Sequence, residues 1–257
     1  MNGAYYIGAT GMRAQQTGLE TIANNVANIN TNTYKRSEVR FSELVSQTRV
    51  QADTVPVDTS FPDILTGVQA RSSPRVFEQG NLRQTGKPFD LAISGDGFVE
   101  VLGPGGQTWL WRGGTLQINA EGALQTDSGL VLKALIDVPI NSSSITIARD
   151  GAVSSVSSGS DVSSEIGKIE LVMPRDSLAL ESVGSGYYRA ASNDELTVLL
   201  PGQDNGGVFV QGSIEASNVE LTTEMVTLLL MQRAYAANAQ VVQAGDQLMA
   251  IANGLRR

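Results

Sequence analysis

Residues 221–251 read LTTEMVTLLLMQRAYAANAQVVQAGDQLMAI, and this stretch decides the fold. Its apolar residues recur alternately three and four positions apart, which is the spacing of a helix that packs against other helices. Between Met225 and Leu255 only Arg233 and Asp246 are charged. A solvated helix surface carries many more charges than this. We therefore expect a long helix that is covered on more than one side.

This C-terminal helix carries two apolar stripes on roughly opposite sides, because residues advance by about 100° around a helix. One stripe consists of Leu221, Met225, Leu228, Tyr235, Ala239, Val242 and Met249. The other consists of Leu230, Ala234, Ala237, Val241, Ala244, Leu248 and Ile251. A single intramolecular partner covers only one stripe, so the other needs a neighbouring molecule. The alternative is that both terminal helices are ordinary core of one large domain.

The N-terminus offers a matching helix with almost no charge, since only Arg13 and Glu20 are ionised between Met1 and Tyr34. The residues that keep the helical spacing are Tyr5, Gly8, Met12, Gln15, Leu19, Ile22, Val26 and Ile29, with Gln15 the one poor fit. The run Asn30-Thr31-Asn32-Thr33 favours a turn, so the helix should end near Ile29. Several glycines lower its helix propensity, and we expect it to become ordered when neighbours bury its stripe.

The middle of the chain reads as β structure between glycine-containing turns. Residues 48–67 include Pro56 and Pro62 and predict a loop or extended linker. Short alternating runs predict strands at 76–77, 91–93, 98–102, 108–111, 116–118 and 196–200. A repeat of strand, acidic-glycine turn and returning strand occurs at 118–124 and again at 147–153. The serine-rich residues 154–164 predict a loop.

The predicted fold class is therefore α+β, with N- and C-terminal helices pairing as a coiled coil and a β-rich middle domain. The predicted domains are a helical domain of residues 1–45 plus 212–257, a linker or extended segment at 46–75, and a β-rich outer domain at 76–211.

Composition excludes several kinds of chemistry. The 257 residues include no Cys and no His, which rules out thiol nucleophiles, disulfides, imidazole or thiolate metal sites and histidine-dependent triads. The net charge of −8 argues against a nucleic-acid partner, because phosphate neutralisation needs clustered Lys and Arg. We expect no catalytic residue, no metal and no cofactor. No apolar run reaches membrane-spanning length and no signal-peptide pattern occurs, so we expect neither membrane insertion nor a cleaved leader.

Blocks at both ends and in the centre resemble the signatures of bacterial flagellar rod and hook proteins. The N-terminal block is Ile22-Ala23-Asn24-Asn25-Val26-Ala27-Asn28-Ile29-Asn30-Thr31 followed by Tyr34-Lys35-Arg36. The central blocks are Gln79-Gly80-Asn81-Leu82, Thr85-Gly86, Asp90-Leu91-Ala92-Ile93 and Gly95-Asp96-Gly97-Phe98. The C-terminal blocks are Gly212 with Glu215, Ser217-Asn218-Val219, Glu224-Met225-Val226, Gln232-Arg233-Ala234-Tyr235 and Asn238. Together they span essentially the whole chain.

Within this family the length, the central blocks and residues 180–184 are most similar to distal rod members, with proximal rod members as the near alternative. The resemblance implies a structural subunit that polymerises into the axial rod of the flagellar basal body, with paired terminal helices inside and the β-rich domain outside. The implied partners are copies of the chain itself, other rod and hook proteins, and surrounding ring proteins. The implied location is the periplasm-spanning rod, reached through the flagellar secretion apparatus.

Two residues depart from the family pattern. Thr33 stands where relatives commonly have Gly, and a β-branched residue resists a positive φ, so the local turn is expected to differ. Gln240 stands where relatives often carry Lys, which puts one inter-subunit charge contact in doubt.

The residues predicted to build the coiled coil and the subunit interface come from both ends of the chain. We expect Tyr5, Met12, Leu19, Ile22 and Val26 to pack against Met225, Leu228, Tyr235 and Val242. We expect Leu230, Val241 and Leu248 to face neighbouring subunits. Asn24, Asn25 and Asn28, together with Gln232 and Arg233, are candidates for inter-subunit hydrogen bonds, with capping and turn formation as the alternative for the asparagines. Arg233 has Glu20 or Glu224 as possible partners.

A hypothesis from a different class is a monomeric β-rich binding or carbohydrate-active domain. Its best support is the pair Trp109 and Trp111, because exposed aromatic rings stack on ligands. Alternate residues share one face of a strand, however, and a buried pair explains them equally well.

Overall fold

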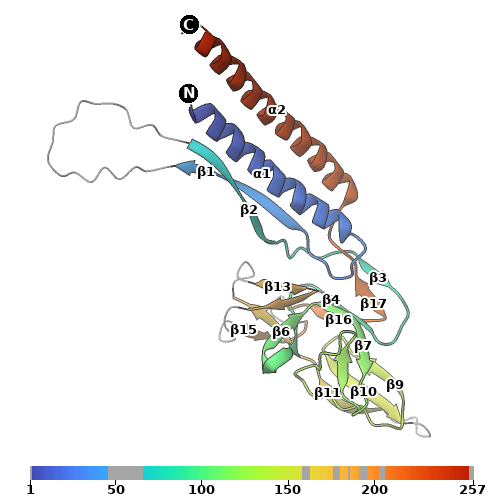
Figure 1. The fold of residues 1–257 in the computed structure, drawn as a ribbon. Coiled ribbons are helices and arrows are strands. Elements are labelled where there is room, and N and C mark those ends of the chain that lie inside the picture. The colour runs from blue at the N-terminus through green and yellow to red at the C-terminus, as the bar shows by residue number, and fades with distance from the viewer. Residues whose placement is uncertain are drawn as a thin grey trace, which may run out of the picture. The chain divides into compact units, whose positions relative to one another are not determined.

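The computed structural model describes residues 2–45, 66–157, 163–175, 180–184, 186–190, 196–202 and 206–254. These residues form an α+β fold with a helix at each end and strands between them (Figure 1). The chain divides into two compact units. The helical unit comprises residues 1–27, 37–73 and 220–257, and the β unit comprises residues 28–36 and 74–219.

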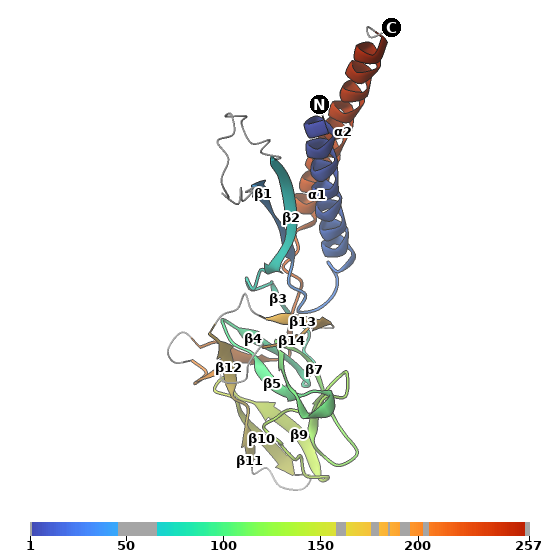
Figure 2. The same ribbon diagram turned by 60° about the vertical axis from the view of Figure 1, so that its left-hand side comes forward.

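The helical unit is built on α1 (Asn2–Ala27) and α2 (Leu221–Gly254), which lie side by side and run in opposite directions (Figures 1 and 2). A two-stranded sheet of β1 (Ser37–Val45) and β2 (Thr66–Arg75) packs beside α1. A side chain at Gly67 on β2 would lie 3.0 Å from Thr10 Oγ1 on α1, so the sheet and the helix are in close contact. The helix α1 thus packs against both α2 and this sheet.

Most strands of the β unit lie in two four-stranded sheets and one three-stranded sheet. The first has the order β13 (Glu181–Gly184), β14 (Tyr187–Arg189), β6 (Thr108–Trp111) and β5 (Val99–Leu102). The second has the order β16 (Val208–Gln211), β4 (Asp90–Ser94), β7 (Gly113–Ile118) and β8 (Leu124–Thr126). The third has the order β11 (Ser163–Lys168), β10 (Ala152–Ser157) and β9 (Ser142–Ile147).

Two further strand pairs complete the described part of this unit. One joins β12 (Leu171–Pro174) to β15 (Leu196–Leu199), and the other joins β17 (Ser213–Glu215) to β3 (Leu82–Gln84). A short 3-10 turn, η1 (Pro104–Gly106), links β5 to β6. The core is apolar, with Leu91, Ile93, Val101 and Leu132 fully buried. A second cluster of buried residues surrounds Phe98 and Tyr188, whose rings meet edge to face.

The sequence predicted most of the central strands, including the strand at 108–111. It also predicted both acidic-glycine turns, which join β7 to β8 and β9 to β10. The serine-rich loop was predicted wrongly in part, because residues 154–157 and 163–164 pair as strands of the β9–β10–β11 sheet. Residues 76–77 are not a strand. Of the segment 46–75 that we expected to be linker or extended, residues 66–75 form β2, and residues 46–65 lie outside the described part.

Candidate assembly surface

The two helices meet along a seam in which small residues of α1 face larger side chains of α2. The buried residues on this face of α1 are Gly8, Gly11, Ala14, Gly18, Ile22 and Asn25. A side chain at Gly8 would come within 2.5 Å of Val242 Cγ2, and one at Gly11 within 2.8 Å of Asn238 Nδ2. The glycines therefore allow close approach of the helices, whereas from the sequence we expected them only to lower helix propensity.

Polar contacts fix both ends of the seam. Near the chain termini, the Tyr5 hydroxyl donates to Asp246 Oδ1 at 2.5 Å. This hydrogen bond is the main cause that raises the pKa of Tyr5 above its ordinary value, since it favours the protonated phenol. At the other end, Asn25 Nδ2 donates to Glu224 Oε1 at 3.2 Å, and both side chains are buried. A hydrogen bond at each end of the seam thus fixes which residues of α1 lie opposite which residues of α2.

Asn25 also fixes the start of β1. Its amide nitrogen donates to the Ser37 carbonyl at 2.9 Å, and its amide oxygen accepts from the Ser37 N–H at 3.0 Å. The side chain therefore pairs with a peptide unit as a neighbouring strand would. This intramolecular role uses the hydrogen-bonding groups that we expected to serve contacts between subunits.

The side of α2 away from α1 is apolar and exposed. Its large residues are Val226, Leu229, Leu230, Val241, Leu248 and Ile251, which are 50–64% exposed. We call these residues the outer face of α2. Arg233 is the positively charged residue on the same side of α2. Apolar surface of this extent on one helix marks an interaction site more often than a free surface.

The other predicted interface residues are distributed as follows. Ile22 is buried in the seam, and Val242 packs over Gly8. Tyr5, Met12, Leu19, Val26, Asn28 and Leu228 are half-buried, whereas Asn24, Gln232 and Arg233 are exposed. Met225 and Tyr235, which we expected to pack against α1, are each 42% exposed. Met225 follows directly on the buried Glu224, so its side chain is turned away from the seam by one helical step.

A buried cluster of charges in the β unit was not predicted from the sequence. Lys35 Nζ donates to Glu215 Oε1 at 2.6 Å and to the Glu78 carbonyl at 2.8 Å. Arg112 Nε donates to Glu215 Oε2 at 3.3 Å. All three charged side chains are at most 3% exposed. Burial lowers the pKa of Lys35, and the Glu215 carboxylate opposes that shift.

This cluster, which we call the Lys35–Glu215–Arg112 knot, joins the blocks on which the family resemblance rests. Glu215 Oε1 accepts from the Gly80 N–H at 2.7 Å, and the Arg112 guanidinium donates to the carbonyls of Gly95 and Gly97. Residues that are far apart in the sequence thus meet around one carboxylate. Sequence spacing gave no sign of this, because Arg112 lies outside the recognised blocks.

The point where the chain enters the β unit lies beside the point where it leaves. The Arg36 N–H donates to Asn218 Oδ1 at 2.7 Å, and Asn218 Nδ2 donates to the Val76 carbonyl at 2.9 Å. The Thr33 N–H donates to the Glu215 carbonyl at 2.9 Å. Residues 33–36 and 215–218 are therefore held together within this unit.

Thr33 keeps the turn that a glycine would favour, contrary to our expectation that the turn would differ. Its φ is +58°, and its side chain is buried. A non-glycine residue in this left-handed region carries strain, which is larger for a β-branched side chain.

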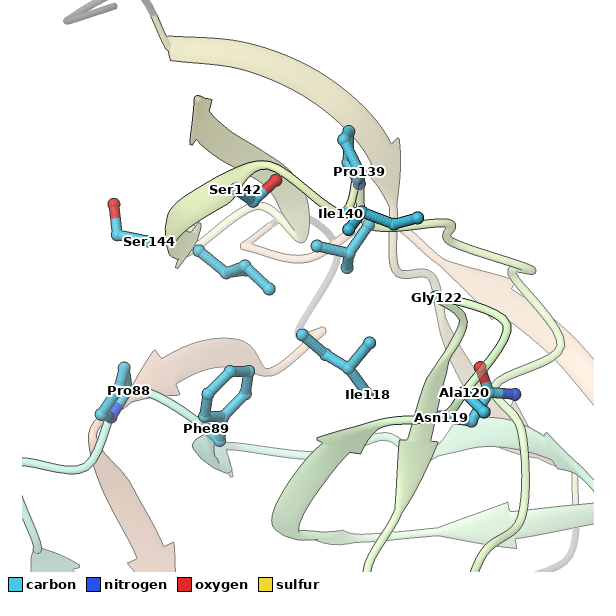
Figure 3. A pocket seen from close by; sticks show the side chains of 12 residues that line it. Pro88, Phe89, Ile118, Asn119, Ala120, Gly122, Pro139, Ile140, Ser142 and Ser144 are labelled. Carbon is cyan, nitrogen blue, oxygen red and sulfur yellow. The ribbon is translucent and has the colours of Figure 1, made fainter. Parts of the chain in front are cut away.

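An apolar pocket of about 450 Å³ opens on the β unit (Figure 3). Phe89, Ile118 and Ile140 contribute to its wall, and none of its lining residues is ionisable. General acid–base chemistry therefore has no candidate group there. The two tryptophans do not form an exposed platform either, because Trp111 is buried in the core and Trp109 packs against that core. Within the described residues, no helix is long and apolar enough to cross a membrane.

Three family profiles match separate parts of the chain. "Flagella basal body rod protein" matches residues 6–35, "Flagellar hook protein FlgE/F/G D1 domain" matches residues 92–155, and "Flagellar basal body rod FlgEFG protein C-terminal" matches residues 210–255. The first match covers most of α1 and Lys35, and the last covers Glu215 and α2. The profiles thus include both helices of the seam and two members of the knot.

Full-length relatives are similar to the chain over almost its whole length. The flagellar basal-body rod protein FlgG of Buchnera aphidicola from Acyrthosiphon pisum is 37% identical over 95% of this chain and 96% of its own. FlgG of Borreliella burgdorferi is 34% identical over 99% of this chain and 98% of its own. In Caulobacter vibrioides, FlgG is 34% identical over 96% of this chain and 97% of its own. The rod protein FlgF of the same organism is 30% identical over 96% of this chain and 95% of its own.

Proposed function

The chain belongs to the family of bacterial flagellar basal-body rod proteins and is a structural subunit of the distal rod type, and from this premise we propose that its copies polymerise through their helical units. The observation that carries this proposal is the outer face of α2. Its large apolar residues remain half or more exposed although the opposite side of the same helix is covered by α1.

The energy available from this face suits a cooperative polymer. Burying a half-exposed Val, Leu or Ile contributes about 1 kcal/mol, so the outer face offers about 6 kcal/mol per contact. Association of two proteins costs about 4–15 kcal/mol in lost freedom of motion. A single contact therefore holds two copies weakly, whereas copies that each make several contacts are stable. We expect monomers in dilute solution and polymers above a threshold concentration.

The helix pair acts in this proposal as an antiparallel coiled coil whose outward sides contact other copies. The two outward sides belong to different helices, so the contact between copies is heterologous. A heterologous contact that does not close on itself generates a helical filament. In this proposal such a filament is the rod.

The same family membership supports the wider setting of the polymer. We propose that the subunit joins other rod and hook proteins end to end, and that its β unit meets the surrounding ring proteins. Its location is the flagellar basal body, and we propose export through the flagellar secretion apparatus. In Caulobacter vibrioides the higher identity belongs to FlgG rather than FlgF, which favours the distal over the proximal type.

Proteolysis of the purified protein, combined with light scattering over a concentration series, tests polymerisation. In dilute solution we expect a monomer that is cut within α1 and α2, leaving a fragment that contains the β unit. Above the threshold concentration we expect large particles in which both helices resist the protease. A monomer at all concentrations with resistant helices contradicts the proposal and favours a closed, monomeric domain.

A further inference from the structure

The charges on the two helices are few, and most of them have an intramolecular partner. The described part of α1 and α2 carries Arg13, Glu20, Glu224, Arg233 and Asp246. Glu224 accepts from Asn25, and Asp246 accepts from Tyr5. The side chains of Arg13 and Arg233 have no ion-pair or hydrogen-bond partner among the residues that the structure describes, and Arg233 is the one on α2.

Glu20 is the carboxylate on these helices that remains available. It is exposed and accepts one hydrogen bond, from Gln16 Nε2 at 3.2 Å. An exposed neutral amide four residues away in the same helix leaves most of a carboxylate's acceptor sites open. Within the described residues, Glu20 and Arg233 are therefore opposite charges that each lack a charged partner.

Helix geometry prevents these two residues from meeting within one copy. Glu20 lies midway between Gly18 and Ile22, both buried in the seam, so it projects about 160° or more away from α2. Arg233 lies two residues after Met231, which packs over Gly18, and so projects to the far side of α2. The charges lie on opposite outward sides of the helix pair.

The outward side of α1 near Glu20 is mostly small, and it carries one further charge, Arg13, seven residues before Glu20. Its exposed residues around that position are Ala9, Arg13, Gln16, Ala23 and Ala27. The outer face of α2 near Arg233 is instead bulky, with Leu230 and Val226. Around Glu20, a surface of small residues with an anion thus complements the surface of large residues around the cation Arg233.

We propose that Arg233 of one copy pairs with Glu20 of the next, and that this pair fixes the register of the contact between copies. The inference rests on the proposed polymerisation and deepens it by naming the two surfaces that meet. Copies related by a rotation about an axis parallel to the helices keep their direction, so α2 of one copy runs antiparallel to α1 of the next. With Glu20 opposite Arg233, the equal rise of both helices places Ala23 opposite Leu230 and Ala27 opposite Val226.

The test uses the charge reversals Arg233→Glu and Glu20→Arg in the full chain. Each single variant brings like charges together at every contact, and we expect the threshold concentration for polymerisation to rise about 100-fold or more. A one-to-one mixture of the two variants restores opposite charges at every contact if the variants alternate. We expect this mixture, and the double variant, to polymerise near the wild-type threshold.

Exposed positions elsewhere provide matched controls. Lys168→Glu and Glu165→Arg reverse charges on the β unit and should leave the threshold unchanged. Circular dichroism of the dilute variants should match the wild type, because Glu20 and Arg233 are exposed. Single variants that polymerise like the wild type, or a mixture that fails to recover, overturn the ion pair. Wild-type protein that never polymerises overturns the proposed function instead, so the two failures are distinguishable.

Discussion

Thr33 adopts a backbone conformation that is unfavourable for a β-branched residue. Its left-handed φ of +58° is held by the surrounding contacts, including the hydrogen bond from its own N–H to Glu215. Thr33→Gly removes the strain, so we expect the free energy of unfolding to rise by about 0.5–1 kcal/mol. Thr33→Ala keeps a Cβ at the same φ and should bring no such gain. Urea titration of both variants checks this, and equal stabilities would contradict the strain argument.

Lys35 is expected to matter for stability far more than a surface lysine. Lys35→Met leaves Glu215 buried without its nearest cation, and we expect a loss of about 3 kcal/mol. Lys133→Met breaks an exposed pair with Glu100 and should cost less than about 1 kcal/mol. Tryptophan fluorescence during urea unfolding reports on the β unit, which contains Trp109 and Trp111. Similar losses for both variants would show that the knot is not a major source of stability.

Tyr188 should make stability fall in strong alkali. Burial raises its pKa from 10.0 to about 12. Between these values the unfolded chain has lost the phenolic proton and the folded chain has kept it, so stability decreases as pH rises from about 10 to 12. The contribution amounts to about 2–3 kcal/mol. Unfolding measured at pH 9 and pH 11.5 should show a smaller decline for Tyr188→Phe, and identical declines would contradict the assignment.

At the scale of elements, the glycines of α1 have different roles that substitution by alanine separates. Alanine raises helix propensity by about 1 kcal/mol at any of these positions. At Gly8 the new Cβ meets the stiff Val242 at 2.5 Å, whereas at Gly18 it meets the flexible Met231 at 3.3 Å. We expect Gly18→Ala to keep or increase helix content and polymerisation. We expect Gly8→Ala to weaken both despite its higher propensity.

Circular dichroism and the polymerisation threshold check this pair of variants. A Gly8→Ala protein that polymerises as readily as Gly18→Ala would mean that the helices do not approach each other as closely as the seam requires.

The elements show what sequence can and cannot predict in this molecule. Periodicity located both helices, and α1 ends at Ala27, two residues before the expected Ile29. Leu230, Val241 and Leu248, which were expected to face neighbours, are exposed, but Met225 and Tyr235 of the other stripe are exposed as well. From the sequence we misjudged the glycines of α1. Helix propensity counts the cost of a glycine within its own helix, but it does not count the benefit of letting a second helix come close. Periodicity left β2 unassigned as a strand, because residues 66–75 lack a clear alternation.

The site was less predictable than the fold. Asn25 was recognised as important, but its partners Ser37 and Glu224 are set by tertiary structure. The knot was missed because one carboxylate collects donors from separate segments of the chain. Such a cluster has no spacing that a sequence pattern can express.

At the scale of the whole molecule, the two units have different tasks. The β unit has a closed apolar core and a satisfied charge cluster, so it should be stable as a monomer. The helical unit leaves one side of α2 apolar and exposed, so it should gain most from assembly. The knot secures the chain segments that lead to both helices. The central claim is that assembly buries the outer face of α2.

Helical reconstruction of the polymer by electron cryo-microscopy tests this claim most directly. We expect α1 and α2 in the inner wall, with Leu230, Val241 and Leu248 covered by α1 of a neighbouring copy and Arg233 next to Glu20. A polymer held together by β units alone, with the outer face of α2 open to solvent, would contradict the claim.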